Sequence, residues 1–251
     1  TRRSSDLGKV TVITGGTSGI GRGIAERILK DSGAEDRIFV TYGHDQKKAE
    51  EFLNDLPGEK RSQVILMKAD MSSYEEMLKF VAKLKAQTDH IDWLVSNAGV
   101  STYEKYENYT FEEWTSIVNT NLSVPVFMIQ ELRPMLVKGG SVLFTGSYAG
   151  QQAYSSSLVY GVTKAAIHFL TKSLVKEFEP KGITVNAIAP GFIETPWHQA
   201  RTQESYDRIN KKIALHRFGT VEEVADMAFA VLSNGYMNGS VVDIHGGYDY
   251  Y

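Results

Sequence analysis

The chain of 251 residues contains no cysteine, which excludes disulfide bonds, thiolate metal ligands and a cysteine nucleophile. No apolar run approaches the roughly 20 residues that span a bilayer, so no membrane partner is expected. A net charge of -3, without a long run of lysine or arginine, gives no general attraction to nucleic acid. The six histidines lack the paired spacing of metal ligands, so no metal is expected. We therefore expect a cytoplasmic protein that binds small molecules and copies of itself.

The N-terminus is polar, because residues 1–8 contain two arginines and no apolar core of a signal peptide. We expect a flexible tail there and a single domain over residues 9–251. With 42% hydrophobic residues, the chain is long enough to bury a sizeable core, and no repeat or linker divides it.

Short runs rich in β-branched residues alternate with longer amphipathic segments along the chain. Strict alternation predicts an α/β fold of Rossmann type, a doubly wound parallel sheet of seven strands with helices on both faces. The strands are expected near 9–14, 37–42, 63–68, 91–96, 140–146, 183–188 and 239–244. The helices are expected near 20–32, 45–56, 73–88, 110–137, 157–180, 200–214 and 221–233.

A glycine-rich turn joins the first expected strand to the first expected helix. Gly15, Gly19 and Gly21 follow the apolar run Val10–Ile13. Glycines let the backbone approach a pyrophosphate closely, and the N–H groups at the start of a helix face the anion. An ordinary glycine-rich turn is the alternative, but the strand-to-helix context favours a dinucleotide site.

Tyr160 and Lys164 lie four residues apart in an expected helix, which places a phenol and an ammonium on one face. A nearby positive charge favours the phenolate, so a tyrosine with an ordinary pKa of about 10 can exchange a proton closer to neutral pH. Ser147 precedes Tyr160 by thirteen residues. Taken alone, each residue also fits a solvated helix face or a turn.

These features occur in order with two further motifs, Asn97-Ala98-Gly99 and Pro190-Gly191. With them, the chain from Lys9 to Gly247 resembles the short-chain dehydrogenase/reductase family, most closely its bacterial 3-oxoacyl-carrier-protein reductases. The resemblance implies an NAD(P)(H)-dependent oxidoreductase that interconverts a carbonyl and a secondary alcohol by hydride transfer.

The resemblance also implies a role for each residue around the reacting carbonyl. Ser147 would orient the carbonyl, Tyr160 would exchange the proton, and Lys164 would hold the nicotinamide ribose while lowering the pKa of the tyrosine. Asn121 matches the fourth catalytic position of the family, which supports a water that leads protons to the lysine. Asn119 lies two residues away, and helix capping is the alternative for either asparagine.

Cofactor contacts follow from the same resemblance. Those expected at the glycine turn are Thr14, Gly15, Thr17, Ser18, Gly19, Ile20 and Gly21. Those expected around the adenosine are Thr41, Tyr42, His44, Asp70, Met71, Asn97, Ala98 and Gly99. Those expected around the nicotinamide are Tyr160, Lys164, Pro190, Gly191, Ile193 and Thr195.

The end of the second expected strand bears on the choice between NAD(H) and NADP(H). A site that prefers NAD(H) usually has an acidic residue there, which binds the ribose 2′-hydroxyl and repels a 2′-phosphate. Tyr42 occupies that place, while Thr41 and His44 offer hydrogen bonds to a phosphate. We expect NADP(H), although Ser18 stands where NADP-using relatives often carry a basic residue and Asp45 is near enough to reach the ribose.

The segment from about 190 to 217 is expected to form a substrate loop, because long irregular segments beside a nucleotide crevice often carry specificity. The expected substrate contacts are Gln152, Tyr154, Trp197 and His198. Their aromatic and hydrogen-bonding groups suit a 3-oxoacyl thioester, but a hydroxysteroid, sugar or polyol dehydrogenase is the alternative. A non-catalytic nucleotide-binding module is a remote alternative, because Tyr160 and Lys164 are both present.

Two kinds of protein partner are considered. An acidic acyl-carrier protein would need a basic patch beside the crevice, for which the candidates are Arg133, Lys138, Lys176 and Lys181. Apolar residues on the segments 110–137 and 157–180 exceed what one sheet face needs, and the resemblance implies a homotetramer built through them. The aromatic C-terminus, residues 248–251, is expected at a subunit contact or beside a neighbouring crevice.

Overall fold

Seven parallel strands form one sheet in the computed structural model, which describes residues 8–153 and 157–248. Across the sheet their order is β3-β2-β1-β4-β5-β6-β7. The chain therefore starts in the middle of the sheet and changes its direction of travel between β3 and β4, which confirms the doubly wound prediction. The strands are β1 (Val10–Ile13), β2 (Arg37–Tyr42), β3 (Val64–Lys68), β4 (Ile91–Ser96), β5 (Leu136–Thr145), β6 (Thr184–Pro190) and β7 (Val241–Ile244).

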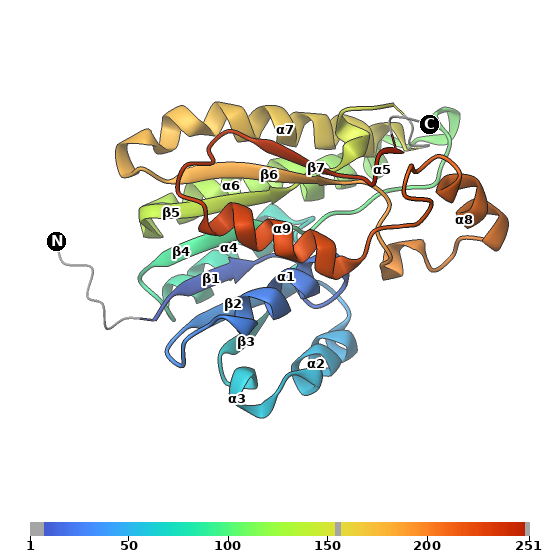
Figure 1. Ribbon diagram of the computed structural model, residues 1–251. Coiled ribbons are helices and arrows are strands. Elements are labelled where there is room, and N and C mark those ends of the chain that lie inside the picture. Colours follow the sequence, from blue (N-terminus) through green and yellow to red (C-terminus); the bar gives the residue numbers. More distant parts are fainter. Residues whose placement is uncertain (1–7, 154–156, 249–251) are drawn as a thin grey trace.

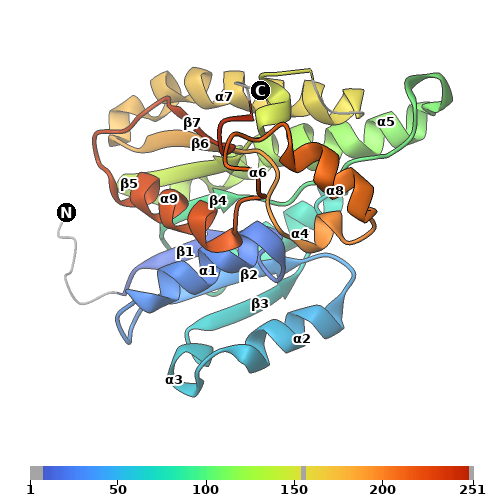
Figure 2. The ribbon, with the colours of Figure 1, turned by 45° about the vertical axis from the view of Figure 1, so that its right-hand side comes forward.

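Helices cover both faces of the sheet (Figures 1 and 2). One face carries α1 (Gly19–Lys30), α2 (Gln46–Asp55) and α9 (Val221–Ser233). The other face carries α4 (Tyr74–Lys85), α6 (Val124–Leu132) and α7 (Leu158–Phe178), with α5 (Phe111–Val118) packed on α7. The short α3 (Gly58–Arg61) precedes β3, and α8 (Gln203–Asn210) lies beyond the carboxyl ends of the strands.

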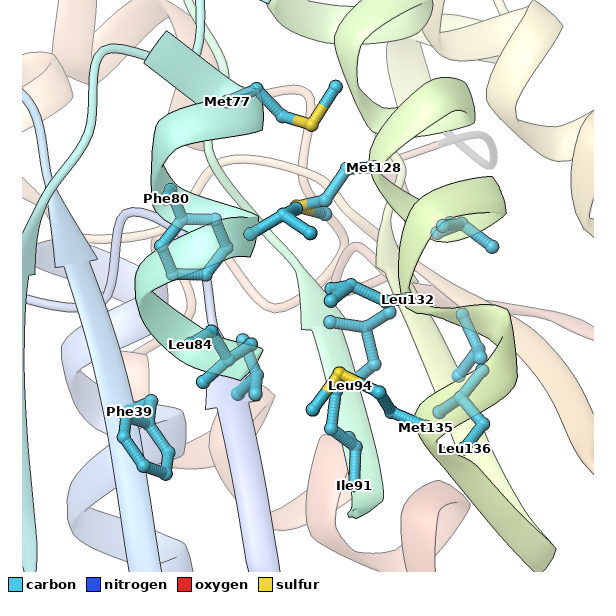
Figure 3. Packing of buried hydrophobic residues seen from close by; sticks show 14 of the residues in the cluster. Phe39, Met77, Phe80, Leu84, Ile91, Leu94, Met128, Leu132, Met135 and Leu136 are labelled. Atoms are coloured by element: carbon cyan, nitrogen blue, oxygen red, sulfur yellow. The ribbon is translucent and has the colours of Figure 1, made fainter. Parts of the chain in front are cut away.

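The larger core lies between the sheet and the layer of α4, α6 and α7. Figure 3 shows Phe80 and Leu84 of α4 pointing toward Met128 and Leu132 of α6, with Leu94 of β4 beneath them. Residues three or four apart share one helix face, so the apolar spacing of α4 and α6 directs both helices onto the strands. Within the described residues, no helix is both long and apolar enough to cross a bilayer.

The helix expected over 110–137 is instead interrupted. α5 ends at Val118, a π-helical turn, η2, covers Asn119–Ser123, and α6 begins at Val124. Pro125 follows this turn without a break in the helical path, so its missing N–H leaves one hydrogen bond of the path unmade. The π turn adds a residue to the helical path, as such turns do near functional sites.

The strand β5 begins four residues earlier than expected, at Leu136 rather than residue 140. Its pairing with β4 shifts register between Ile91 and Trp93. Gly139 lies in the same stretch with a φ of +73°, a left-handed conformation that interrupts regular pairing. Gly139 and Gly140 therefore lie at an irregularity within the strand.

Candidate active site

A cavity of about 910 Å³ opens at the carboxyl ends of the strands. Its wall includes Gly15 after β1, Asn97 after β4, Ser147 after β5 and Pro190 at the end of β6. Ligands of doubly wound sheets bind at this edge, where the strand order reverses. The motifs expected to converge on one crevice do so.

Glycines leave the loop between β1 and α1 without side chains at the positions where a phosphate would approach. Gly15 and Gly19 have φ values of +62° and +52°, the left-handed region that favours glycine. A Cβ on Gly21 would overlap the side-chain amide of Asn97 and the carbonyl oxygen of Gly15. The loop and the first turn of α1 thus expose backbone N–H groups to the cavity, which fits a dinucleotide pyrophosphate.

Polar side chains fix this loop from behind. The Thr14 hydroxyl accepts hydrogen bonds from the N–H groups of Asn97 and Ala98, each at 3.0 Å. The Thr41 hydroxyl accepts from the Gly15 N–H at 3.1 Å. Asn97 donates through Nδ2 to the carbonyl oxygens of Thr14 at 3.1 Å and Gly15 at 3.0 Å. These bonds tie the ends of β1, β2 and β4 together.

Most of the expected cofactor residues line the cavity. They are Gly15, Ser18, Gly19, Ile20, Thr41, His44, Asp70, Met71, Asn97, Ala98, Gly99, Tyr160, Lys164, Pro190, Gly191, Ile193 and Thr195. Thr14, Thr17, Gly21 and Tyr42 do not line it. Successive side chains of a strand point to opposite faces, so Thr41 in the cavity wall directs Tyr42 away.

Two acidic residues flank the adenosine end. His44 Nε2 lies 3.3 Å from Asp70 Oδ2. Burial raises the pKa of Asp70. Hydrogen bonds from the Ser72 N–H and hydroxyl, together with the His44 charge, lower this pKa by more than burial raises it, so it lies below its usual range. Asp45 caps α2 by accepting from the Lys48 N–H at 3.0 Å, so its carboxylate is engaged away from a ribose.

Lys164 is buried on α7, one turn after Tyr160, as the spacing predicted. Its ammonium donates a 2.6 Å hydrogen bond to the Thr145 carbonyl oxygen and lies 5.5 Å from the centre of the Tyr160 ring. Burial lowers the pKa of Lys164 to about 8. The side chain therefore carries a positive charge at neutral pH and loses it under mildly alkaline conditions.

The pKa of Tyr160 differs from the expectation. Burial raises it, and a hydrogen bond with Ser147 lowers it by less, so the net shift is upward. Lys164 contributes no lowering of this pKa, contrary to the expectation. A phenol that keeps its proton at neutral pH is suited to donate it, which is the role required for carbonyl reduction.

Ser147 has a hydroxyl proton to offer in the cavity. Its Oγ accepts from the Ala149 N–H at 3.2 Å, which occupies a lone pair and not the proton. Ser147 begins the 3₁₀ turn η4 (Tyr148–Gly150), which packs against α7. The strand end and the helix therefore hold Ser147 and Tyr160 within hydrogen-bond reach.

Asn121 joins three parts of the site from behind the cavity wall. Its Nδ2 donates to the Val100 carbonyl oxygen at 2.9 Å and to the Thr163 hydroxyl at 3.0 Å, while Oδ1 accepts from the Val100 N–H at 2.8 Å. The π turn is thereby fixed to the loop after β4 and to α7. The Asn119 side chain has no such bond to the described residues, which favours Asn121 of the two.

His168 is a site residue that the sequence interpretation missed. Its Nε2 accepts from the Ser147 N–H at 3.3 Å, and a Cβ on Gly146 would overlap that nitrogen. Burial, followed by the Lys164 charge, lowers the pKa of His168 to about 4, so the ring is neutral. The spacing of four residues from Lys164 on α7 was the available signal.

The expected substrate residues separate in the structure. Trp197 and His198, in the 3₁₀ turn η6 (Pro196–His198), line the cavity, and the Trp197 ring lies 5.8 Å from the Tyr160 ring. Gln152 is exposed and lines a smaller pocket that shares Ala149 and Ser157 with this cavity, so its contact with the substrate stays a prediction. Tyr154 lies outside the described residues.

The basic patch was assigned to the wrong end of the molecule. Arg133 and Lys138 flank the start of β5, and Lys176 and Lys181 lie near the end of α7, opposite the carboxyl edge. Lys181 donates to the carbonyl oxygens of Arg133 at 3.1 Å and Leu136 at 3.0 Å, which makes it a structural cap. These four cations do not flank the crevice of their own chain.

Comparisons with known proteins agree with this geometry. A family model described as Enoyl-(Acyl carrier protein) reductase matches residues 15–249. The chain is 33% identical over 244 residues to a 3-oxoacyl-[acyl-carrier-protein] reductase of Aquifex aeolicus, covering 96% of this chain and 97% of that one. It is 32% identical over 246 residues to an acetoacetyl-CoA reductase of Rhizobium meliloti, covering 96% and 98%.

A solved structure extends the likeness to three dimensions. A short chain dehydrogenase of Burkholderia cenocepacia in complex with NADP superimposes with a TM-score of 0.88 at 25% identity, over 97% of this chain and 98% of that one. The strand order, the glycine-rich loop and the placement of Tyr160 and Lys164 one turn apart on α7 are those expected from the sequence motifs. The chain therefore belongs to the short-chain dehydrogenase/reductase family and is an oxidoreductase acting on carbonyl and alcohol groups.

Proposed function

We propose that the protein uses NADP(H) to reduce a 3-oxoacyl thioester to the corresponding 3-hydroxyacyl thioester. One observation carries the proposal: the glycine-rich loop after β1 lines the same cavity as Ser147, Tyr160 and Lys164. A hydride donor held by the loop and a proton donor held by α7 then reach a single carbonyl. The thioester substrate is supported by the names of the Aquifex and Rhizobium relatives, with coenzyme A or an acyl-carrier protein as the carrier.

The chain's residues supply binding, orientation and the proton. When bound, a reduced nicotinamide supplies a hydride to the carbonyl carbon. Ser147 donates a hydrogen bond to the carbonyl oxygen, and Tyr160 gives its hydroxyl proton to that oxygen as negative charge develops there. Lys164 offers its ammonium to the nicotinamide ribose, and Asn121 keeps the π turn, the β4 loop and α7 in register.

The preference for NADP(H) is supported by the cavity edge at the end of β2. Gly43 and His44 line the cavity there, and Asp45 is engaged as a helix cap, so no carboxylate of this turn repels a 2′-phosphate. The similar Burkholderia structure is a complex with NADP.

We also propose a homotetramer assembled through α5 and α7. Its support is a set of apolar side chains on the outer surface of these helices. The exposed fractions are 79% for Phe111, 74% for Phe169, 49% for Val162 and 44% for Leu158. Exposed apolar surface of this extent is typical of an interface.

The catalytic assignment is tested with Tyr160→Phe, acetoacetyl-CoA and NADPH. Loss of the hydroxyl removes the proton donor and keeps the ring, so we expect turnover to fall by about 10²- to 10⁴-fold with the Kd for NADPH nearly unchanged. Tyr74→Phe, on the exposed face of α4, serves as the control. Near-normal turnover of Tyr160→Phe would contradict the role of Tyr160, and a wild type inert toward thioesters would contradict the substrate.

A further inference from the structure

The cavity continues past the catalytic residues to a group of cations that the proposed chemistry does not use. Arg201, Arg208 and Lys212 line its far side, together with Ile209. All four residues belong to α8 or to its flanks, and α8 lies beyond the carboxyl ends of the strands (Figure 2). Arg208 and Lys212 are four residues apart, so their side chains leave the same side of the segment about one turn from each other.

Arg201 is held in a fixed orientation. Its Nε donates to His198 Nδ1 at 2.9 Å, one guanidinium nitrogen lies 3.4 Å from the Ser205 hydroxyl, and the group lies 5.5 Å from the Phe192 ring. Burial, followed by the Arg201 charge, lowers the pKa of His198 to about 4. Because Nδ1 accepts this bond, the neutral ring carries its proton on Nε2 and adds a donor to the cavity wall.

The other two cations are left free on a well-anchored element. Ile209, Ile213 and Phe218 form a small core under α8, and the Tyr206 ring stacks on Phe218 at 4.6 Å. Arg208 and Lys212 are exposed and have neither an ion pair nor a hydrogen bond to the described residues. The segment therefore presents two uncommitted positive charges at a defined place.

No carboxylate at that end of the cavity balances these charges. Among the described residues that line it, Asp70 is the one acidic side chain, and it lies at the adenosine end beside His44. Glu194 interacts with the Tyr206 hydroxyl and does not line the cavity. An uncompensated group of cations facing a cleft attracts and binds anions.

We propose that Arg201, Arg208 and Lys212 bind an anionic group of the substrate, a phosphate or a carboxylate, that lies away from the reacting carbonyl. This inference rests on the proposed function, in which Tyr160 marks the position of that carbonyl. Trp197 packs near Tyr160 and His198 bonds to Arg201, so the turn η6 connects the reaction centre to the anion site. The substrate is then a molecule with a ketone at one end and a negative charge at the other.

Two variants separate this site from the cofactor site. Arg208→Gln/Lys212→Gln removes two exposed charges from the cavity wall, and Lys176→Gln/Lys211→Gln removes two exposed charges outside it. Both proteins are first titrated with NADP⁺. We expect the two variants to have equal Kd values for NADP⁺. A Kd raised only in Arg208→Gln/Lys212→Gln would assign these cations to the cofactor and overturn the proposal.

Binding of the anion is then measured by calorimetry on protein saturated with NADP⁺. Coenzyme A tests a phosphate, with uncharged pantetheine as its partner, and cholate tests a carboxylate, with methyl cholate as its partner. We expect one anion to bind about tenfold or more tightly than its uncharged partner, and Arg208→Gln/Lys212→Gln to remove that difference. Wild-type protein that discriminates neither pair would overturn the proposal.

Turnover provides a second reading with acetoacetyl-CoA and the uncharged acetoacetyl-N-acetylcysteamine. We expect the ratio of their kcat/KM values to fall about tenfold in Arg208→Gln/Lys212→Gln, chiefly through KM, and the wild-type ratio to fall with added salt. An unchanged kcat/KM ratio, together with anions that bind no more tightly than their uncharged partners, would reject the anion site and leave the proposed reaction intact. Charge-dependent binding without any thioester turnover rejects the proposed reaction and keeps the anion site.

Discussion

We expect a single position at the edge of the cavity, Gly43, to be able to change the cofactor preference. Gly43 lines the cavity after β2, and a Cβ built there would meet no atom within 4 Å. Gly43→Asp therefore adds a carboxylate without a steric clash, and we expect it to shift the ratio of kcat/KM for NADPH over NADH toward NADH by about tenfold or more. Gly43→Asn is the matched control, because it has the same shape without the charge.

The sequence indicated that no acidic residue ends β2, and it placed the decisive position for cofactor choice at Tyr42. In the structure Tyr42 does not line the cavity. The strand itself was predicted with its observed bounds, but the cavity edge is formed by Gly43 and His44 just beyond it, and the sequence does not specify the backbone path of that turn. The direction of the Tyr160 pKa shift was also missed, because burial of the phenol is the larger effect and the sequence does not show how deeply that group is buried.

Lys164 gives a prediction for the pH dependence of cofactor binding. Its pKa of about 8 lies below the ordinary value for lysine, so the ammonium predominates below that pH and the neutral amine above it. If the ammonium binds the nicotinamide ribose, the affinity for NADPH falls as the pH rises through about 8. Titration between about pH 7 and 9.5 measures this, and Lys164→Met is expected to give a weaker affinity that no longer varies with pH over that range.

Among the elements, α7 positions the reaction through its contact with the turn η4. A Cβ on Gly150 would lie 2.6 Å from the Lys164 carbonyl carbon and 2.7 Å from the Ala165 nitrogen, both rigid backbone atoms. We expect Gly150→Ala to separate the turn from the helix, lower the free energy of unfolding by about 1–3 kcal/mol and reduce kcat. Gly235→Ala is the control, because nothing lies within 4 Å of a Cβ there.

Denaturant unfolding and steady-state kinetics on the two variants distinguish the outcomes. Loss of stability with unchanged kcat would mean that the helix moves without disturbing Ser147 and Tyr160. Equal behaviour of Gly150→Ala and Gly235→Ala would show that η4 does not press on α7.

The elements themselves were largely predictable, and the exceptions have physical causes. Amphipathic periodicity identified α1, α4, α7 and α9 within a few residues, because each buries one continuous face. The π turn Asn119–Ser123 was not predicted, since it preserves the helical pattern of apolar residues and changes only the backbone hydrogen bonds. The early start of β5 was not predicted because the strand contains Gly139 and Gly140, and glycines are typical of turns.

At the scale of the whole molecule, assembly is tested with Phe169→Glu. The Phe169 side chain is 74% exposed on α7, so a charge there is tolerated by the fold and disfavoured in an apolar interface. We expect light scattering to show a tetramer for the wild type and smaller species for Phe169→Glu at micromolar concentration. Lys172→Glu, exposed on the same helix, is the control. A wild-type monomer with full activity would reject the tetramer and leave the catalytic assignment intact.

The aromatic C-terminus is a poorer probe of assembly than the sequence indicated. Tyr248 lines the cavity of its own chain, and its ring lies 5.5 Å from that of Phe192. Its removal would therefore alter the substrate side of the site as well as any subunit contact. The remaining residues, 249–251, lie outside the described part of the chain.

The order of the strands has a consequence for how this enzyme can diversify. The loops after β1 to β4 supply the expected contacts for the pyrophosphate and adenosine of the cofactor, while the residues after β5 to β7 supply those for the nicotinamide, together with the acid, the hydroxyl and the cations around the molecule being reduced. The first group ends at Gly99 and the second begins at Ser147, so a single crossover between them separates the two specificities in the gene. Recombination at the start of β5 would exchange either the choice between NAD(H) and NADP(H) or the class of ketone substrate, and leave the other property unchanged.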